Sequence, residues 1–199
     1  MAGRVIKQPR PALGRYKACF VSGEISGAQA ANSPFFALQW ADTVNLFVLR
    51  YFKMWFYEST FSSAQGIDLG AFVCRPFTVA DSGGTASQMQ TGKNKSETKM
   101  PDSRLVGLGD IRIATTTALT AGTRTPDPYP FKTLAVYDGA VGSYVMPDGD
   151  ALDENKIPIV LGYQEGIEIQ NITALAASNV IRLYIDLAWE EVNPNTFEG

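Results

Sequence analysis

The sequence predicts an all-β protein: an antiparallel β-sandwich, jelly-roll-like, with an extended N-terminal arm. Three observations support this fold class. Short segments of alternating apolar and polar residues recur along the 199 residues, and this is the period of a half-buried strand. Turn-forming residues separate the segments, with Gly (18) and Pro (11) slightly above their usual share. No segment combines the apolar period and the capping residues of an amphipathic helix.

Residues 1–15 predict the arm, and residues 16–199 predict a single β-sandwich domain. Proline restricts the backbone to polyproline or β geometry, and both Pro9 and Pro11 lie in the arm. No acidic residue precedes Glu24. The cations that we take as candidate protein-interface residues are Arg4, Lys7, Arg10 and Arg15. Arms of this kind lie on another surface or are disordered.

The first part of the domain contains four predicted strands. They cover residues 16–21, 35–40, 44–57 and 67–79. The third is apolar on both faces, so its pattern also fits a buried helix, but its aromatic and β-branched content favours a strand. Strict alternation within it places Val48 on the face of Phe52, and Leu49 on the opposite face. Pro76 predicts a bulge or an edge in the fourth strand.

Residues 80–104 change in character. They are polar, rich in Gly, Ser, Thr and Lys, and nearly devoid of apolar side chains apart from Met89 and Met100. A loop of this length is uncommon inside a compact domain and tends to be functional or mobile. Since strand patterns resume after it, we expect a projecting loop between strands and not a linker between domains.

Further strands are predicted after this loop. They cover residues 110–116, 131–137, 142–146, 157–161, 166–170 and 179–190. Asp138-Gly139, between two of them, is a hairpin signal. The last segment alternates most strictly, with apolar residues such as Ile185 on one face and polar residues such as Asp186 on the other. That pattern is typical of a half-buried strand in an antiparallel sheet.

Charge and composition exclude several classes of function. Lys plus Arg is 17 and Asp plus Glu is 20, giving a formal charge of −3, whereas duplex-binding domains are usually basic. The chain contains no histidine, which removes Ser-His-Asp and Cys-His nucleophile systems and most zinc hydrolases. We therefore expect a protein that is not an enzyme, binds no nucleic acid and has no small-molecule substrate.

The acidic residues suggest two weak sites. Residues 148–154 supply four carboxylates, the oxygen ligands that hard cations prefer, but Leu152 breaks the EF-hand pattern. Glu190 and Glu191 are adjacent, so on a strand their side chains point to opposite faces and cannot converge on one bond. We interpret both as surface charges, together with Glu165 and with Glu168, which alternates outward between two isoleucines. The sequence therefore predicts no metal, no cofactor and no catalytic residue.

Cysteine and aromatic residues leave two questions open. Cys19 and Cys74 form no CxxC pair, which is typical of small buried side chains, and their spacing does not decide whether they form a disulfide. Four aromatic residues alternate outward on predicted strands, where they either stack on sugars or pack against a second sheet or subunit. They are Tyr51, Trp55, Tyr57 and Tyr184.

The sequence shows no export or membrane signal. The charged N-terminal residues contain no apolar core of a signal peptide. No uncharged apolar stretch reaches the length of a membrane span, because Arg50 and Lys53 interrupt the most apolar segment. We therefore expect a protein made in a cytoplasm that makes no contact with a membrane.

The two ends of the chain differ in charge. Cations crowd the first 17 residues, whereas the residues beyond Arg182 contain Glu190, Glu191 and Glu198 and no cation. Complementary charges steer association and fix register between subunits. Chain ends that are solvated and contact no partner would show the same difference in charge.

Five segments together resemble a family of small virion proteins encoded by tailed bacteriophages. The likeness spans roughly residues 20–192, with the arm and the 80–104 loop outside the common pattern. Its motifs are structural rather than catalytic. The segments are Phe36–Trp40, Gly109–Thr123, Ile159–Leu161, Glu165–Ile167 and Asp186–Val192.

This resemblance implies a β-sandwich structural protein of the phage virion, assembled in the host cytoplasm. Its leading form is a capsid decoration (cement) protein, whose partners are the major capsid protein and copies of itself in a homotrimer. The alternatives are a tail, fibre or head–tail joining component, or a carbohydrate-binding module on a receptor-recognising appendage. The basic arm would then lie on an acidic capsid or on a neighbouring subunit.

Overall fold

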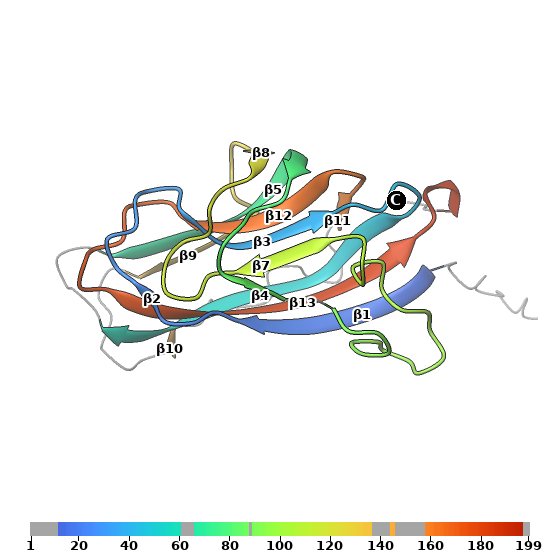
Figure 1. Cartoon of the computed structure of the whole chain (residues 1–199), viewed down its shortest axis with the longest axis horizontal. Coiled ribbons are helices and arrows are strands. Elements are labelled where there is room, and N and C mark those ends of the chain that lie inside the picture. The colour runs from blue at the N-terminus through green and yellow to red at the C-terminus, as the bar shows by residue number, and fades with distance from the viewer. Residues whose placement is uncertain (1–11, 61–65, 88, 137–143, 146–157, 197–199) are drawn as a thin grey trace, which may run out of the picture.

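Two antiparallel sheets pack face to face in the computed structural model, which describes residues 12–60, 66–87, 89–136, 144–145 and 158–196 (Figure 1). The predicted all-β sandwich is therefore confirmed. Among these residues, the helical part is a single 3-10 turn, Pro194–Thr196. No helix in them has the length and apolar character needed to cross a membrane.

The first sheet contains the longest described strand, β4, beside the long strand β13 at its centre. Its order is β1-β13-β4-β10, with β11 also paired to β4 and β2 also paired to β13. The strands are β1 (Ala12–Val21), β2 (Ile25–Ser26), β4 (Leu46–Thr60), β10 (Tyr144–Val145), β11 (Ile159–Leu161) and β13 (Val180–Val192).

The second sheet lies opposite and has the order β6-β7-β3-β12-β5-β8, with β9 also paired to β5. Its strands are β3 (Pro34–Trp40), β5 (Ile67–Val79), β6 (Thr85–Ala86), β7 (Asp110–Ile113), β8 (Thr123–Pro126), β9 (Lys132–Val136) and β12 (Glu165–Asn171).

The strand pairs are nested along the chain. The outermost pair is β1 with β13, and the next is β3 with β12. Inside them, β4 pairs with β10 and β11, and β5 pairs with β8 and β9. All are antiparallel, and successive pairs alternate between the two sheets, which is the wrapped arrangement of a jelly roll. The jelly-roll expectation therefore describes the observed topology.

The strict alternation of β13 places its apolar side chains between the sheets. Ile181, Ile185 and Trp189 are buried there, as predicted. The Trp189 ring stacks on Tyr16 of β1 at 5.6 Å and on Phe47 of β4 at 5.5 Å between centroids. Large aromatic rings dominate the energetics of such cores, and these three tie the central strands together.

Three local features differ from, or refine, the predicted strands. The first strand begins at Ala12 and not at residue 16. In β4, the register shifts between Leu49 and Tyr51, so Leu49 lies in the core with Phe52, and the alternation predicted for this strand was wrong before Tyr51. A shift at Pro76 in β5 matches the predicted bulge. The Asp138-Gly139 hairpin signal lies outside the described residues.

Candidate functional site

The outer surface of the first sheet is the candidate interaction surface. We call it the open face, since its side chains point away from the second sheet and most are exposed or half-buried, whereas Glu190 and Val48 are buried. It includes Arg15, Lys17, Cys19, Val21, Val48, Arg50, Tyr51, Lys53, Trp55, Tyr57, Arg182, Tyr184, Asp186, Ala188 and Glu190.

The register of β1, β13 and β4 arranges these side chains in rows across the sheet. One row places Ala188 between Lys17 and Tyr51. The next places Asp186 between Cys19 and Lys53. Residues directly opposite on antiparallel strands have Cβ atoms about 4.5–5.5 Å apart. The short Ala188 side chain is therefore surrounded by much longer neighbours.

This contrast in side-chain length produces a pocket of about 380 Å³. Ligand-binding pockets usually have volumes of roughly 300–1,000 Å³, so the pocket is large enough for one apolar side chain or a small ligand. The residues that line it come from three strands and one loop. They are Lys17, Ala18, Cys19, Tyr51, Asn94, Asp186, Leu187 and Ala188.

The loop wall of the pocket comes from the 80–104 segment. The Lys17 amide donates to the Asn94 carbonyl at 3.0 Å, the Asn94 side chain donates to the Lys17 carbonyl at 3.0 Å, and the Ser96 amide donates to the Arg15 carbonyl at 2.9 Å. The segment therefore pairs with the edge of β1. Edge hydrogen bonds at residues 94–96 hold this part of the predicted projecting loop against the sheet.

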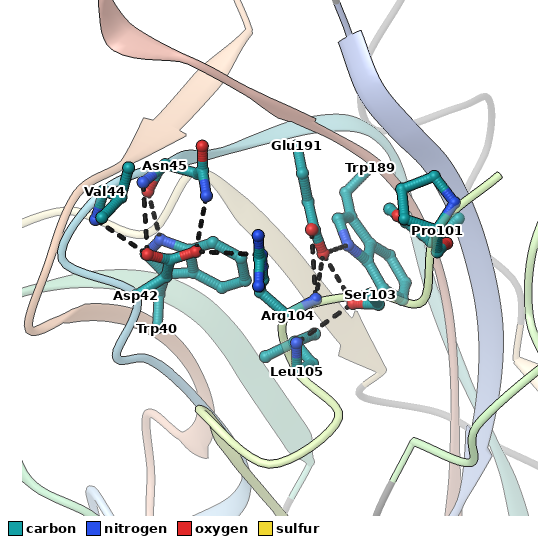
Figure 2. A network of polar contacts seen from close by, with 11 residues as sticks. Trp40, Asp42, Val44, Asn45, Pro101, Ser103, Arg104, Leu105, Trp189 and Glu191 are labelled. Atoms are coloured by element: carbon teal, nitrogen blue, oxygen red, sulfur yellow. Dashed lines mark hydrogen bonds and ion pairs between the residues drawn. The ribbon is translucent and has the colours of Figure 1, made fainter.

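Figure 2 shows how this segment is tied to the end of β13. Glu191 accepts hydrogen bonds from the Ser103 hydroxyl at 2.6 Å and from the Arg104 amide at 3.0 Å. The Trp189 indole donates to the same carboxylate at 3.4 Å. Burial raises the pKa of Glu191, and the hydrogen bonds from Ser103 and Arg104 oppose that rise. The interpretation of Glu191 as surface charge was wrong, since it is buried beneath this segment.

Asp42 completes the same network (Figure 2). Its carboxylate accepts from the Val44 amide at 2.7 Å and from the Asn45 side chain at 2.8 Å, and lies 3.6 Å from the Arg104 guanidinium. Burial acts to raise the pKa of Asp42, but the hydrogen bonds from Asn45 and Val44, with Arg104, lower it below its ordinary value. The network therefore holds the 80–104 segment against the end of β13 and the residues that follow β3.

Ion pairs on the open face leave two cations without an acidic partner. Glu190 pairs with Arg15 at 2.8 Å and with Arg50 at 2.8 Å, and Arg182 pairs with Glu24 at 3.3 Å. Among the described residues, Lys17 and Lys53 form no ion pair, and the Lys53 ammonium lies 5.9 Å from the Trp55 ring centroid. Lys17 lines the pocket, and Lys53 lies in the neighbouring row, opposite Asp186.

The structure describes one of the four predicted interface cations, Arg15. Arg15 lies within β1 and pairs with Glu190 of the same chain. Part of the charge complementarity between the two chain ends is therefore satisfied inside one molecule. Arg4, Lys7 and Arg10 lie outside the described residues. Glu190 and Glu191 point to opposite faces, as predicted, and Glu190 is also buried rather than a surface charge.

The two cysteines are free and lie in different sheets. Cys19 is exposed on β1, and Cys74 is buried in β5. They are unpaired in the structure, which answers the question that their spacing left open. Burial and the hydrogen bond to Asp186 raise the pKa of the Cys19 thiol to about 11.

The outer surface of the second sheet, in contrast, is covered. Residues 80–84 and 119–124 cross it, with Leu119 donating to the Pro34 carbonyl at 2.8 Å (Figure 1). We call this surface the covered face. Its buried outward side chains include Ala37, Cys74, Phe77 and Glu168.

A buried ionic cluster lies on the covered face. The Arg124 guanidinium contacts both Asp81 and Glu168 and lies 5.6 Å from the Phe77 ring centroid. Glu168 alternates outward, as predicted, but the interpretation as a surface charge was wrong because the chain covers this side of the sheet. Alternation identifies which residues share a face and does not reveal whether that face is solvated.

Of the other candidate sites, the acidic residues 148–154 lie outside the described residues. Within the part of the chain that the structure describes, no three His, Cys, Asp or Glu side chains gather in a way that holds a metal ion. Gly83 and Gly84 adopt positive φ in a turn beside Thr120 and Ile113, which explains these glycines as turn residues.

The sequence did not identify the pocket. One signal was present: Ala188 is the small residue in the outward series between Asp186 and Glu190. The contribution of Asn94 depends on long-range pairing with β1 and has no local signal. No family model matches the chain, and no curated protein matches it either.

Proposed function

We propose that this protein is a structural component of a tailed-phage virion, a capsid decoration (cement) protein that binds the major capsid protein and forms a homotrimer. The observation that carries the proposal is the open face, a long sheet surface with a pocket and with two lysines that form no ion pair to any described residue. The segments that resemble small phage virion proteins support the same class. The proposal includes assembly in the host cytoplasm and no catalytic role.

Binding through such a face would strengthen the shell by mass action. A partner that binds the assembled state and not the dissociated state stabilises the assembled state. Standard protein interfaces bury about 800 Å² on each partner, and the three long adjacent strands β1, β13 and β4 offer an extended surface for this. Many modest contacts across subunit junctions would then oppose the outward pressure of packaged DNA.

The basic arm supports the same partner. Arg4, Lys7 and Arg10 immediately precede β1, an edge strand of the open face. We propose that these cations contact an acidic region of the capsid beside the open face. Since residues 12–15 belong to β1, the variant that tests the arm is a deletion of residues 1–11, which leaves the strand intact.

Binding to purified heads that lack the protein tests the proposal. The full chain should bind at saturable sites, and deletion of residues 1–11 should weaken binding and reduce its dependence on salt. Absence of binding by the full chain would contradict the capsid role, and unchanged binding by the deletion would contradict the role of the arm. Electron microscopy of the particle separates a head location from a tail, fibre or joining location.

A second candidate function is sugar binding, since Trp55 and Tyr184 stack on the open face at 5.5 Å with 5° between their planes. Each ring covers part of the other, which leaves less ring surface for a sugar. Binding to a glycan array that is lost in Trp55→Ala would favour this alternative. Equal and negligible glycan binding by both proteins would exclude it.

A further inference from the structure

The open face has the opposite charge balance to the chain as a whole. The chain has a formal charge of −3, whereas the open face carries five cations and two acids, with a third acid, Glu24, paired to Arg182 at its end. The cations are Arg15, Lys17, Arg50, Lys53 and Arg182, and the acids are Asp186 and Glu190. Complementary potentials select partners and fix their orientation. A partner that covers this face is therefore expected to be acidic where it meets the lysines.

The pocket at Ala188 supplies an apolar point within this basic surface. Its lining combines the short Ala188 side chain and Tyr51 with the polar residues Lys17, Asn94 and Asp186, while the Leu187 side chain packs in the core. Interfaces draw most of their binding energy from a few side chains that fill well-packed pockets. A partner's apolar side chain can occupy the space above Ala188, and acidic residues beside that side chain can then pair with Lys17 and Lys53.

The pocket is already formed in the unbound chain. Two hydrogen bonds join Asn94 to Lys17, and the Ser103–Glu191 contact fixes the far end of the same segment. Preorganised surfaces bind more tightly because less ordering accompanies association. The wall needs no rearrangement before a side chain enters.

We propose that the Ala188 pocket receives an apolar side chain from an acidic segment of the major capsid protein, and that Lys17 and Lys53 pair with the carboxylates that flank it. This inference rests on the proposed function, and it names the point of contact. It places the anchor of the interface at the centre of the open face and not on the arm.

Filling the pocket tests the anchor directly. Ala188→Phe occupies the space, and Ala135→Phe is the matched control, because Ala135 is an exposed strand residue on β9 of the other sheet. Binding to heads should fall by about tenfold or more for Ala188→Phe and stay within about twofold for Ala135→Phe. Equal binding by both variants and the unchanged chain would overturn the inference. Thermal unfolding of each variant verifies that it is folded.

Charge reversal tests the acidic neighbours. The double variant Lys17→Glu, Lys53→Glu should bind heads more weakly and with a smaller dependence on salt, because fewer charge pairs form. Lys132→Glu on β9 is the control in the second sheet and should leave binding unchanged. A double variant that binds as tightly as the unchanged chain would contradict an acidic partner at this point.

Cysteine labelling provides a test without substitution. Cys19 lines the pocket and is exposed, whereas Cys74 is buried and serves as an internal reference. The raised pKa of Cys19 slows its reaction with maleimide, so labelling requires mildly alkaline buffer and long incubation. Bound protein should label at Cys19 several-fold more slowly than free protein. Equal labelling of free and bound protein would overturn the inference.

Two results separate this inference from the proposed function. If the unchanged chain fails to bind heads, both are overturned. If it binds and Ala188→Phe binds equally, the capsid role stands and the pocket assignment fails. A change of oligomeric state in Ala188→Phe, measured by light scattering, would mean that the pocket contacts another copy of this chain and would overturn the capsid protein as its occupant.

Discussion

The open face and the covered face both contain charged side chains, but the surroundings of those charges differ. On the covered face, Arg124, Asp81 and Glu168 contact one another beneath the chain, with side chains at most 6% exposed. On the open face, Lys17 and Lys53 have no acidic partner within the described residues, and Arg15 is 57% exposed. The same sandwich therefore contains one buried set of charges in mutual contact and one exposed set in which two lysines have no acidic partner among the described residues.

This difference in surroundings predicts which substitutions affect the stability of the fold and which affect binding to a partner. Removing one member of a buried ion pair leaves an uncompensated charge in a poorly solvated site, which is strongly destabilising. Exposed charges contribute little to folding but remain available to steer a partner. Substitutions on the covered face should therefore affect unfolding, and substitutions on the open face should affect association.

The largest effect is expected for Arg124→Met. Loss of the guanidinium leaves Asp81 and Glu168 buried without their cation, at a cost of about 3–5 kcal/mol in the free energy of unfolding. Arg75→Met is the matched control, since Arg75 lies in the same sheet with a 40% exposed side chain and pairs with Asp127, and it should cost about 1 kcal/mol or less. Urea denaturation measures the free energy of unfolding of both variants. Equal losses would contradict the distinction between buried charges in mutual contact and exposed charges.

Ser103→Ala tests the segment that supports the pocket wall. It removes the 2.6 Å hydrogen bond to the buried Glu191 carboxylate, and hydrogen bonds to charged groups contribute about 1.5–3 kcal/mol. Ser26→Ala is the control, because the exposed Ser26 hydroxyl donates to a neutral carbonyl of Thr116. Urea denaturation should show a clear loss for Ser103→Ala and a change within about 0.5 kcal/mol for Ser26→Ala; a reversed order would count against a structural role for the Glu191 contact.

Glu58 is a buried acid that has no ion-pair partner among the described residues. It lies in β4 with no exposure, and neither carboxylate oxygen has a hydrogen-bond partner among the described residues. Burial raises the pKa of Glu58, so the folded protein favours the protonated form. The stability from this group is complete below the pKa of the unfolded chain and is lost as pH rises through the folded pKa.

Glu58→Met should therefore stabilise the protein by about 0.5–2 kcal/mol at neutral pH, with a smaller gain in acid. Thermal unfolding at about pH 4.5 and pH 7.5 measures this difference, and Glu97→Met in the exposed loop is the control. A gain that is larger in acid than at neutral pH would contradict the assignment of Glu58 as an unmatched buried acid.

The sequence predicted most of the fold because periodicity records which side chains face the core. The alternation of β13 and the bulge at Pro76 were both visible locally. The bulge in β4 was not, because Arg50 leaves the core pattern only when β4 is paired with β13. Glu168 shows the same limit, since its burial depends on residues 119–124, which come from another part of the chain. The pocket depends on Ala188 and Asn94, which long-range pairing brings together.

The smallest effect on stability is expected on the open face itself. Lys53→Met removes a half-exposed cation whose ammonium lies 5.9 Å from the Trp55 ring centroid, so the free energy of unfolding should change by about 0.5–1 kcal/mol or less. The same substitution should still weaken binding to heads, because it removes one of the two lysines without an acidic partner. Urea denaturation and head binding measured on the same preparation compare the two effects. A variant that loses stability and keeps its binding would reverse the roles assigned to the two faces, since Lys53 would then serve the fold as Arg124 does.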